Sequence, residues 1–193
     1  SWRTISEKHC LVLALSSSEL MFEHNIFARL TEWQAQGHKT GLATLIGIDG
    51  SSPRPIGAQI ALTEDGRYIG NISSGCAEEA IIAELQIAVT EKRNHVTRYG
   101  KDSPYLDVVL PCGSGLDILF NGADLTHITA QVSALHMARQ TAFVAVQPDN
   151  SLAVSATADS DKAMAYSPEY RLHIFGAGLQ LISFAELAQA MNY

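Results

Sequence analysis

The spacing of apolar residues along the chain predicts three helices in its first three quarters. Residues 77–92 show the clearest pattern, with apolar side chains on one side and polar ones on the other, which is typical of an amphipathic helix. Residues 21–36 show a similar spacing and end before Gly37, a residue type that often follows the last turn of a helix. Asp124 is placed to cap a third helix that reaches about Arg139.

Short apolar runs between these helices predict strands, because each run is bounded by residue types that favour turns. The expected strands are residues 42–48, 58–63, 67–72, 95–99, 106–110, 116–120, 142–147, 152–155 and 172–175. The two runs around Glu64-Asp65-Gly66 form a hairpin in this interpretation. Together the elements predict an α/β fold with a mixed sheet, in which some strands are parallel and others antiparallel.

The same pattern divides the chain into four parts. Residues 21–156 form the α/β domain, and residues 157–170 are polar without an apolar period, which predicts a linker. Residues 171–193 have the strand, glycine turn and helix that open a Rossmann-like domain. We expect this domain to be incomplete, since the acidic residue of such folds comes about 20 residues after the first glycine. Residues 1–20 are an N-terminal arm to which the pattern assigns no role.

Composition and charge exclude several classes of partner. The chain has 193 residues, of which 47% are hydrophobic, and a net charge of −7 without a cluster of Lys or Arg. This balance argues against nucleic acid and against an anionic membrane as partners. The longest apolar run, Cys10–Leu15, is too short for a membrane span or the core of a signal peptide. We therefore expect a soluble, cytoplasmic protein.

Three loops share a design in which an apolar strand leads into small residues. They are GSSPRPIG at residues 50–57, SSGC at residues 73–76 and PCGSG at residues 111–115. Small residues expose backbone N–H groups, which together with the guanidinium of Arg54 can bind anionic oxygens such as phosphate. One such loop alone is better explained as a tight turn, but three of them favour an anionic ligand.

Two of the three cysteines lie in these loops. Cys76 precedes the predicted helix 77–92, whose positive end stabilises a thiolate, and Cys112 lies in an accessible loop between proline and glycine. Cys10 lies in an apolar run and is expected in a core. Their wide spacing argues against disulfides and against a structural zinc site. Burial is the alternative for all three, and no histidine is placed to form a Cys–His nucleophilic pair.

The order and spacing of these motifs resemble the XdhC/CoxI family from about Met21 to the end of the chain. The matching segments are GSSPRPIG, the pattern Gly-x-x-Ser-x-Gly-Cys-x-Glu at residues 70–78, LPCGSG at residues 110–115 and IFGAG at residues 174–178. The resemblance implies a molybdenum cofactor accessory protein, a maturation chaperone and not a classical catalyst. Such a protein binds the cofactor, supports its sulfuration and delivers it to a xanthine dehydrogenase-like molybdenum hydroxylase.

Transferred to this chain, the resemblance assigns cofactor binding to nine loop residues. They are Ser51, Ser52, Pro53, Arg54, Gly75, Cys76, Glu78, Cys112 and Gly113. Cys76 and Cys112 are the expected molybdenum ligands, because a soft thiolate suits a metal–dithiolene centre, and we expect them in one pocket. The family commonly has a second glycine where this chain has Ser74 and Ser114.

The implied partners are a molybdenum hydroxylase as client and further copies of the chain in a homo-oligomer, and a cysteine desulfurase fits the sulfuration step. Gly176 and Gly178 match the Rossmann-like turn, so NAD(P) is expected only in a complete C-terminal domain. An NAD(P)-dependent oxidoreductase that uses this segment is the alternative, although Leu181 stands where the fingerprint has its third glycine or alanine. A third interpretation is a binding module whose loops only form turns.

Overall fold

The computed structural model describes residues 4–7, 10–14, 25–103, 110, 113–158, 163–169, 171–176 and 178–190. These residues belong to two compact units, of which the larger is formed by residues 23–168 and the smaller by residues 1–22 together with 169–193. In the described part of the chain, no helix is both long and apolar enough to cross a membrane.

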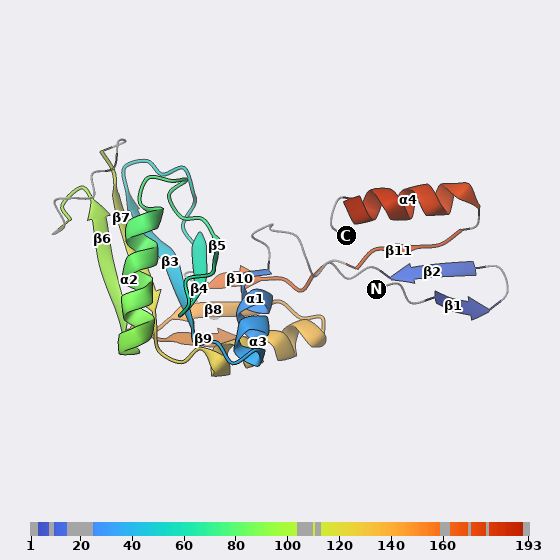
Figure 1. Cartoon of the computed structure of the whole chain (residues 1–193), viewed down its shortest axis with the longest axis horizontal. Helices are drawn as coiled ribbons and strands as arrows, with labels where there is room; N and C mark the ends of the chain where they lie inside the picture. Colours follow the sequence, from blue (N-terminus) through green and yellow to red (C-terminus); the bar gives the residue numbers. More distant parts are fainter. Residues whose placement is uncertain are drawn as a thin grey trace. The chain divides into compact units, whose positions relative to one another are not determined.

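A five-stranded sheet forms the centre of the larger unit (Figure 1). Its strands, in spatial order, are β5 (Tyr68–Gly70), β4 (Gln59–Thr63), β3 (Thr40–Asp49), β7 (Gly115–Asn121) and β6 (Asn94–Gly100). All four pairings are antiparallel, so the expectation of a mixed sheet is wrong for these strands. The reason is strand order: β5, β3 and β6 run in one direction, and β4 and β7, which run in the other, lie between them.

Helices cover both faces of this sheet. Helix α2 (Glu78–Glu91) packs on one face, and α1 (Ile26–Ala35) and α3 (Thr126–Met137) pack on the other. Ile118 and Phe120 belong to the core beneath α2, whereas Leu119 between them belongs to the core beneath α1 and α3. This alternation explains the unbroken apolar runs in the sequence, because both sides of each central strand are buried.

A small antiparallel sheet completes the core beneath α1 and α3. Its strands, in spatial order, are β10 (Met164–Tyr166), β8 (Ala142–Val146) and β9 (Leu152–Ser155). Strand β10 lies within the segment 157–170 that the sequence predicts as a linker, so a short strand interrupts that segment. Three residues are too few to show a period of two, and β10 is held by contacts such as the edge-on packing of the Tyr166 ring on Phe27, with 4.7 Å between ring centres.

In the smaller unit, the N-terminal arm forms a sheet with a strand from residues 171–193. Strands β1 (Thr4–Glu7), β2 (Cys10–Ala14) and β11 (His173–Ile174) form an antiparallel sheet, and α4 (Leu179–Ala190) follows β11. The strand, glycine turn and helix expected of a Rossmann-like start are present, but β11 pairs antiparallel with β2. The parallel pairing of a dinucleotide fold is therefore not seen among the described strands.

Candidate functional site

The strand register brings three loops to one edge of the five-stranded sheet (Figure 1). We call them the first loop (residues 50–57), the second loop (residues 71–77) and the third loop (residues 110–114). Gly115 pairs with both Asp49 and Gly100, so β3 and β6 end where β7 begins. Gly70 pairs with Ile60, so β5 ends near the start of β4. The first and second loops therefore adjoin the same end of β4, and the first and third adjoin the same end of β7.

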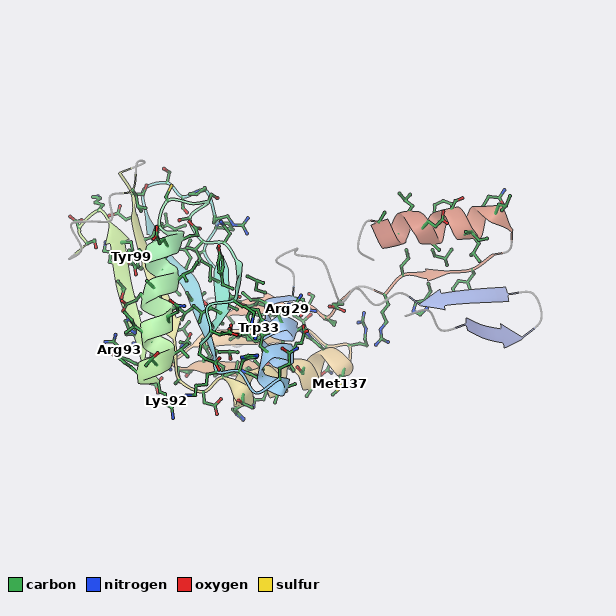
Figure 2. All side chains as sticks on the ribbon, in the orientation of Figure 1. Arg29, Trp33, Lys92, Arg93, Tyr99 and Met137 are labelled. Atoms are coloured by element: carbon green, nitrogen blue, oxygen red, sulfur yellow. The ribbon has the colours of Figure 1, made fainter. Side chains whose placement is uncertain are left out.

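Figure 2 shows which end of α2 lies on the side of the loops. Tyr99, a residue of β6 that is 3% exposed and belongs to the core beneath α2, lies on the side of the loops. Lys92 and Arg93 lie at the opposite end of α2. The N-terminus of α2, with its positive partial charge, therefore faces the loop edge of the sheet.

The first and third loops are joined through Ser114. The buried Ser114 hydroxyl accepts a hydrogen bond from the backbone N–H of Ser51 at 2.9 Å, and the two hydroxyl oxygens are 3.5 Å apart. Gly50 has a φ of +99°, and a Cβ there would lie 2.9 Å from the Ser114 hydroxyl. Ser114, where the resemblance leads us to expect glycine, therefore links the two loops through a hydroxyl that glycine lacks.

Beneath these two loops, the guanidinium of Arg98 connects three strands. It donates to both carboxylate oxygens of Asp117 on β7 at 3.1 Å and to Asp49 at the end of β3 at 3.0 Å. Its Nε donates to the carbonyl of Lys101 at 2.8 Å, just after β6. Gly115 leaves room for this group, since a Cβ there would lie 2.6 Å from an Arg98 nitrogen.

The second loop is organised around Glu78, the first residue of α2. One carboxylate oxygen accepts from the backbone N–H of Ile72 at 3.1 Å and of Ser73 at 2.6 Å. The other accepts from the Ser73 hydroxyl at 2.5 Å and the N–H of Gly75 at 2.6 Å. Partial burial raises the pKa of Glu78, but the bonds from Ser73, Gly75 and Ile72 outweigh it and hold the pKa below its ordinary value.

Two further hydrogen bonds fix the path of the second loop. The Ser73 hydroxyl accepts a hydrogen bond from Ala77 N–H at 2.7 Å, and the Asn71 side chain accepts one from Ser74 N–H at 3.0 Å. Ser74 has a φ of +56°, in the left-handed region, which explains why glycine is common there in the family that this sequence resembles. The loop then presents Cys76, whose side chain is exposed.

The structure describes eight of the nine loop residues that the sequence singles out, and their role in binding stays a prediction. Ser51, Ser52, Pro53 and Arg54 lie in the first loop, where the Ser52 hydroxyl accepts from Arg54 N–H at 3.3 Å. Gly75, Cys76 and Glu78 lie in and just after the second loop, and Gly113 lies in the third. Cys112 lies outside the described residues, so a pocket that it shares with Cys76 stays a prediction. Gly176 and Gly178 lie in the smaller unit.

Sequence reasoning missed Arg98 and Asp117. Each is a charged residue on a predicted strand, and the two charges are opposite, which is the only sign of a pair in the sequence. The register that makes them neighbours is not visible in local sequence. Among the described residues, no group of three or more His, Cys, Asp or Glu side chains is arranged to hold a metal ion.

Comparison with known proteins gives three similarities. Residues 33–100, which include the first and second loops, match the model of the XdhC and CoxI family. Over 161 residues the chain is 34% identical to the molybdenum cofactor insertion chaperone PaoD of Escherichia coli (strain K12), a match that covers 79% of this chain and 50% of PaoD. A crystal structure described as a xanthine dehydrogenase from Bacillus halodurans has a similar fold, with a TM-score of 0.59 and 20% identity.

That structural match covers 74% of this chain and 53% of the Bacillus protein. The chain therefore spans about half the length of the relatives that it matches. At this identity the Bacillus structure supports the fold alone.

Proposed function

Since residues 33–100 match the XdhC and CoxI family, we propose that the chain is a chaperone that binds the molybdenum cofactor and inserts it into a client molybdoenzyme. The name of the relative PaoD, a molybdenum cofactor insertion chaperone at 34% identity, supports this proposal. The structural observation that carries it is the exposed thiol of Cys76, which a fixed loop presents at the edge where three glycine-bearing loops adjoin.

In this proposal the two ends of the cofactor meet different loops. The cofactor carries molybdenum on a dithiolene, and the thiolate of Cys76 is the soft ligand that such a centre prefers. Cys112 is the proposed second thiolate. The first loop, with Arg54 as a planar hydrogen-bond donor, is the proposed site for the phosphate of the cofactor, together with Gly113 in the third loop.

Release is as important as binding for a chaperone. A monodentate thiolate on an exposed loop can be exchanged for a ligand of the client without unfolding the domain. The finer steps that we propose are sulfuration of the bound cofactor with sulfur from a cysteine desulfurase, and delivery to a xanthine dehydrogenase-like hydroxylase in the cytoplasm. The chaperone acts as a homo-oligomer in this proposal.

The alternative of an NAD(P)-dependent oxidoreductase has less support. Gly176 and Gly178 do join a strand to a helix, but β11 pairs antiparallel with β2, whereas a dinucleotide site is built at the ends of parallel strands. Calorimetry of the chain with NAD and NADP tests this alternative, and we expect no saturable binding at micromolar concentrations.

Transfer of isolated cofactor tests the main proposal. The chain is incubated with molybdenum cofactor, separated by gel filtration and mixed with the cofactor-free form of a molybdenum hydroxylase. We expect the cofactor to elute with the wild-type chain and to activate the hydroxylase, and we expect Cys76→Ser to lose both effects. Cys10→Ser, which removes a cysteine outside the three loops, is the matched control. Equal transfer by Cys76→Ser and Cys10→Ser would contradict the assigned role of Cys76.

A further inference from the structure

The concave side of the second loop already holds an anion, and that anion is the carboxylate of Glu78. Its two oxygens accept four hydrogen bonds, three from backbone N–H groups and one from the Ser73 hydroxyl. Converging N–H groups before a helix are the arrangement that proteins use for phosphate and other anions. In this loop the protein supplies the anion itself, from the first residue of α2.

The carboxylate of Glu78 already occupies this contact. Ile72 is 0% and Ser73 is 1% exposed, so two of the three backbone N–H groups belong to buried residues, whereas the third belongs to the exposed Gly75 and Glu78 itself is half-buried. A phosphate brought to the same N–H groups would have to displace Glu78 or lie beside its negative charge, and both cost free energy. Cys76 is different, because it is exposed and its thiol makes none of these contacts with Glu78.

We infer that Glu78 is a positioning residue: its carboxylate holds the second loop in shape from within, so that this loop meets its ligand through the thiol of Cys76 and not through backbone N–H groups. The phosphate of the ligand then belongs to the first loop. This inference rests on the proposed function only for the identity of the ligand. The contacts of Glu78 and their consequences for Cys76 can be tested without the molybdenum cofactor.

Replacement of the internal carboxylate by a small external one is the direct test. Glu78→Ala leaves the loop N–H groups intact and removes their acceptor, and formate has the carboxylate that fits the space. We expect Glu78→Ala to lower the midpoint of thermal unfolding by about 4–8 °C. We expect formate at about 0.1 M to raise that midpoint by about 3 °C, relative to chloride at the same ionic strength. Wild type should show no such shift with formate.

Glu79 provides the matched control, since it is an exposed glutamate in the same helical turn. Glu79→Ala removes the same charge near the helix N-terminus but should show no formate rescue. If formate stabilises Glu78→Ala no more than wild type or Glu79→Ala, the inference is overturned.

The positioning of Cys76 is tested through its rate of alkylation by iodoacetamide, followed by mass spectrometry of the peptide that contains it. Glu78→Gln keeps the size of the side chain but places an amide N–H₂ against N–H donors, so the loop opens more often. We expect Cys76 to react about threefold faster or more than in wild type, with Glu79→Gln unchanged. This variant also serves if Glu78→Ala does not fold. Equal rates in Glu78→Gln, Glu79→Gln and wild type would contradict the inference.

Discussion

Replacement of Arg98 by methionine should destabilise the larger unit more than any other single change at a charged residue of the loop edge. The guanidinium makes two hydrogen bonds to Asp117, one to Asp49 and one to the carbonyl of Lys101. Methionine keeps the apolar stem and removes all four. It also leaves Asp117 without this cation, whereas Asp49 keeps its ion pair with Lys101 at 3.2 Å.

The magnitude follows from how far these groups are exposed. The side chain of Arg98 is 27% exposed, that of Asp117 is 34% exposed and that of Asp49 is 42% exposed. An exposed ion pair contributes about 0.2–1 kcal/mol, and the loss of one partner from a fully buried pair costs about 3–5 kcal/mol. Arg98 lies between these limits, so we expect Arg98→Met to lower the free energy of unfolding by about 2–3 kcal/mol. For a chain of this length the midpoint of thermal unfolding then falls by about 5–10 °C.

Urea unfolding followed by the fluorescence of Trp33 measures this change. Trp33 is a buried residue of α1, and a Trp2→Phe background makes it the only tryptophan of the chain. Arg93→Met is the control, because Arg93 pairs with Glu91 at the other end of α2 and its side chain is 48% exposed (Figure 2). A loss below about 0.5 kcal/mol in Arg98→Met, or an equal loss in Arg93→Met, would refute the reasoning.

Three smaller changes test the loops themselves. Ser114→Ala removes the acceptor of the Ser51 N–H and should lower the free energy of unfolding by about 1 kcal/mol in urea titrations, whereas an unchanged value would mean that water replaces the hydroxyl at no cost. Ser74→Gly should raise it by about 0.5–1 kcal/mol, because glycine adopts a φ of +56° without strain and keeps the N–H that Asn71 accepts; a loss would show that the bond from the Ser74 hydroxyl to Asn71 outweighs that strain. Because the folded pKa of Glu78 lies below its ordinary value of 4.5, its stabilisation is complete above pH 4.5 and is lost as the pH falls. The difference in unfolding free energy between wild type and Glu78→Gln should therefore shrink below pH 4.5, and a constant difference down to about pH 2 would contradict the lowered pKa.

Local sequence predicted the elements of the larger unit better than their arrangement. The spacing of apolar residues in 77–92 predicted α2, and the turn at Gly66 predicted the hairpin of β4 and β5. The expected mixed sheet was wrong because strand order depends on which strand fills the place next to β3, and no local pattern records that choice. Strand β10 was missed because three residues show no period.

The candidate site also has features that local sequence predicts and features that it does not. The position of Gly75 and Cys76 just before α2 could be predicted from the apolar spacing of residues 77–92, and residues 33–100 do match the XdhC and CoxI family. Their role in binding stays a prediction. The contacts of Glu78 could not be predicted, since a glutamate in the first turn of a helix is usually explained by the helix dipole alone. Arg98 was missed because its partners come from strands that are far apart in the sequence.

The molybdenum and pterin content of the purified chain tests the central claim most directly. The wild-type chain and its Cys76→Ser and Cys10→Ser variants are produced in cells that make molybdenum cofactor, and metal and pterin are measured on the same samples. We expect wild type and Cys10→Ser to contain molybdenum and pterin in a fixed ratio to protein, and Cys76→Ser to contain little of either. Wild type without molybdenum, or Cys76→Ser with as much as wild type, would contradict the claim that this loop binds the cofactor through its thiol.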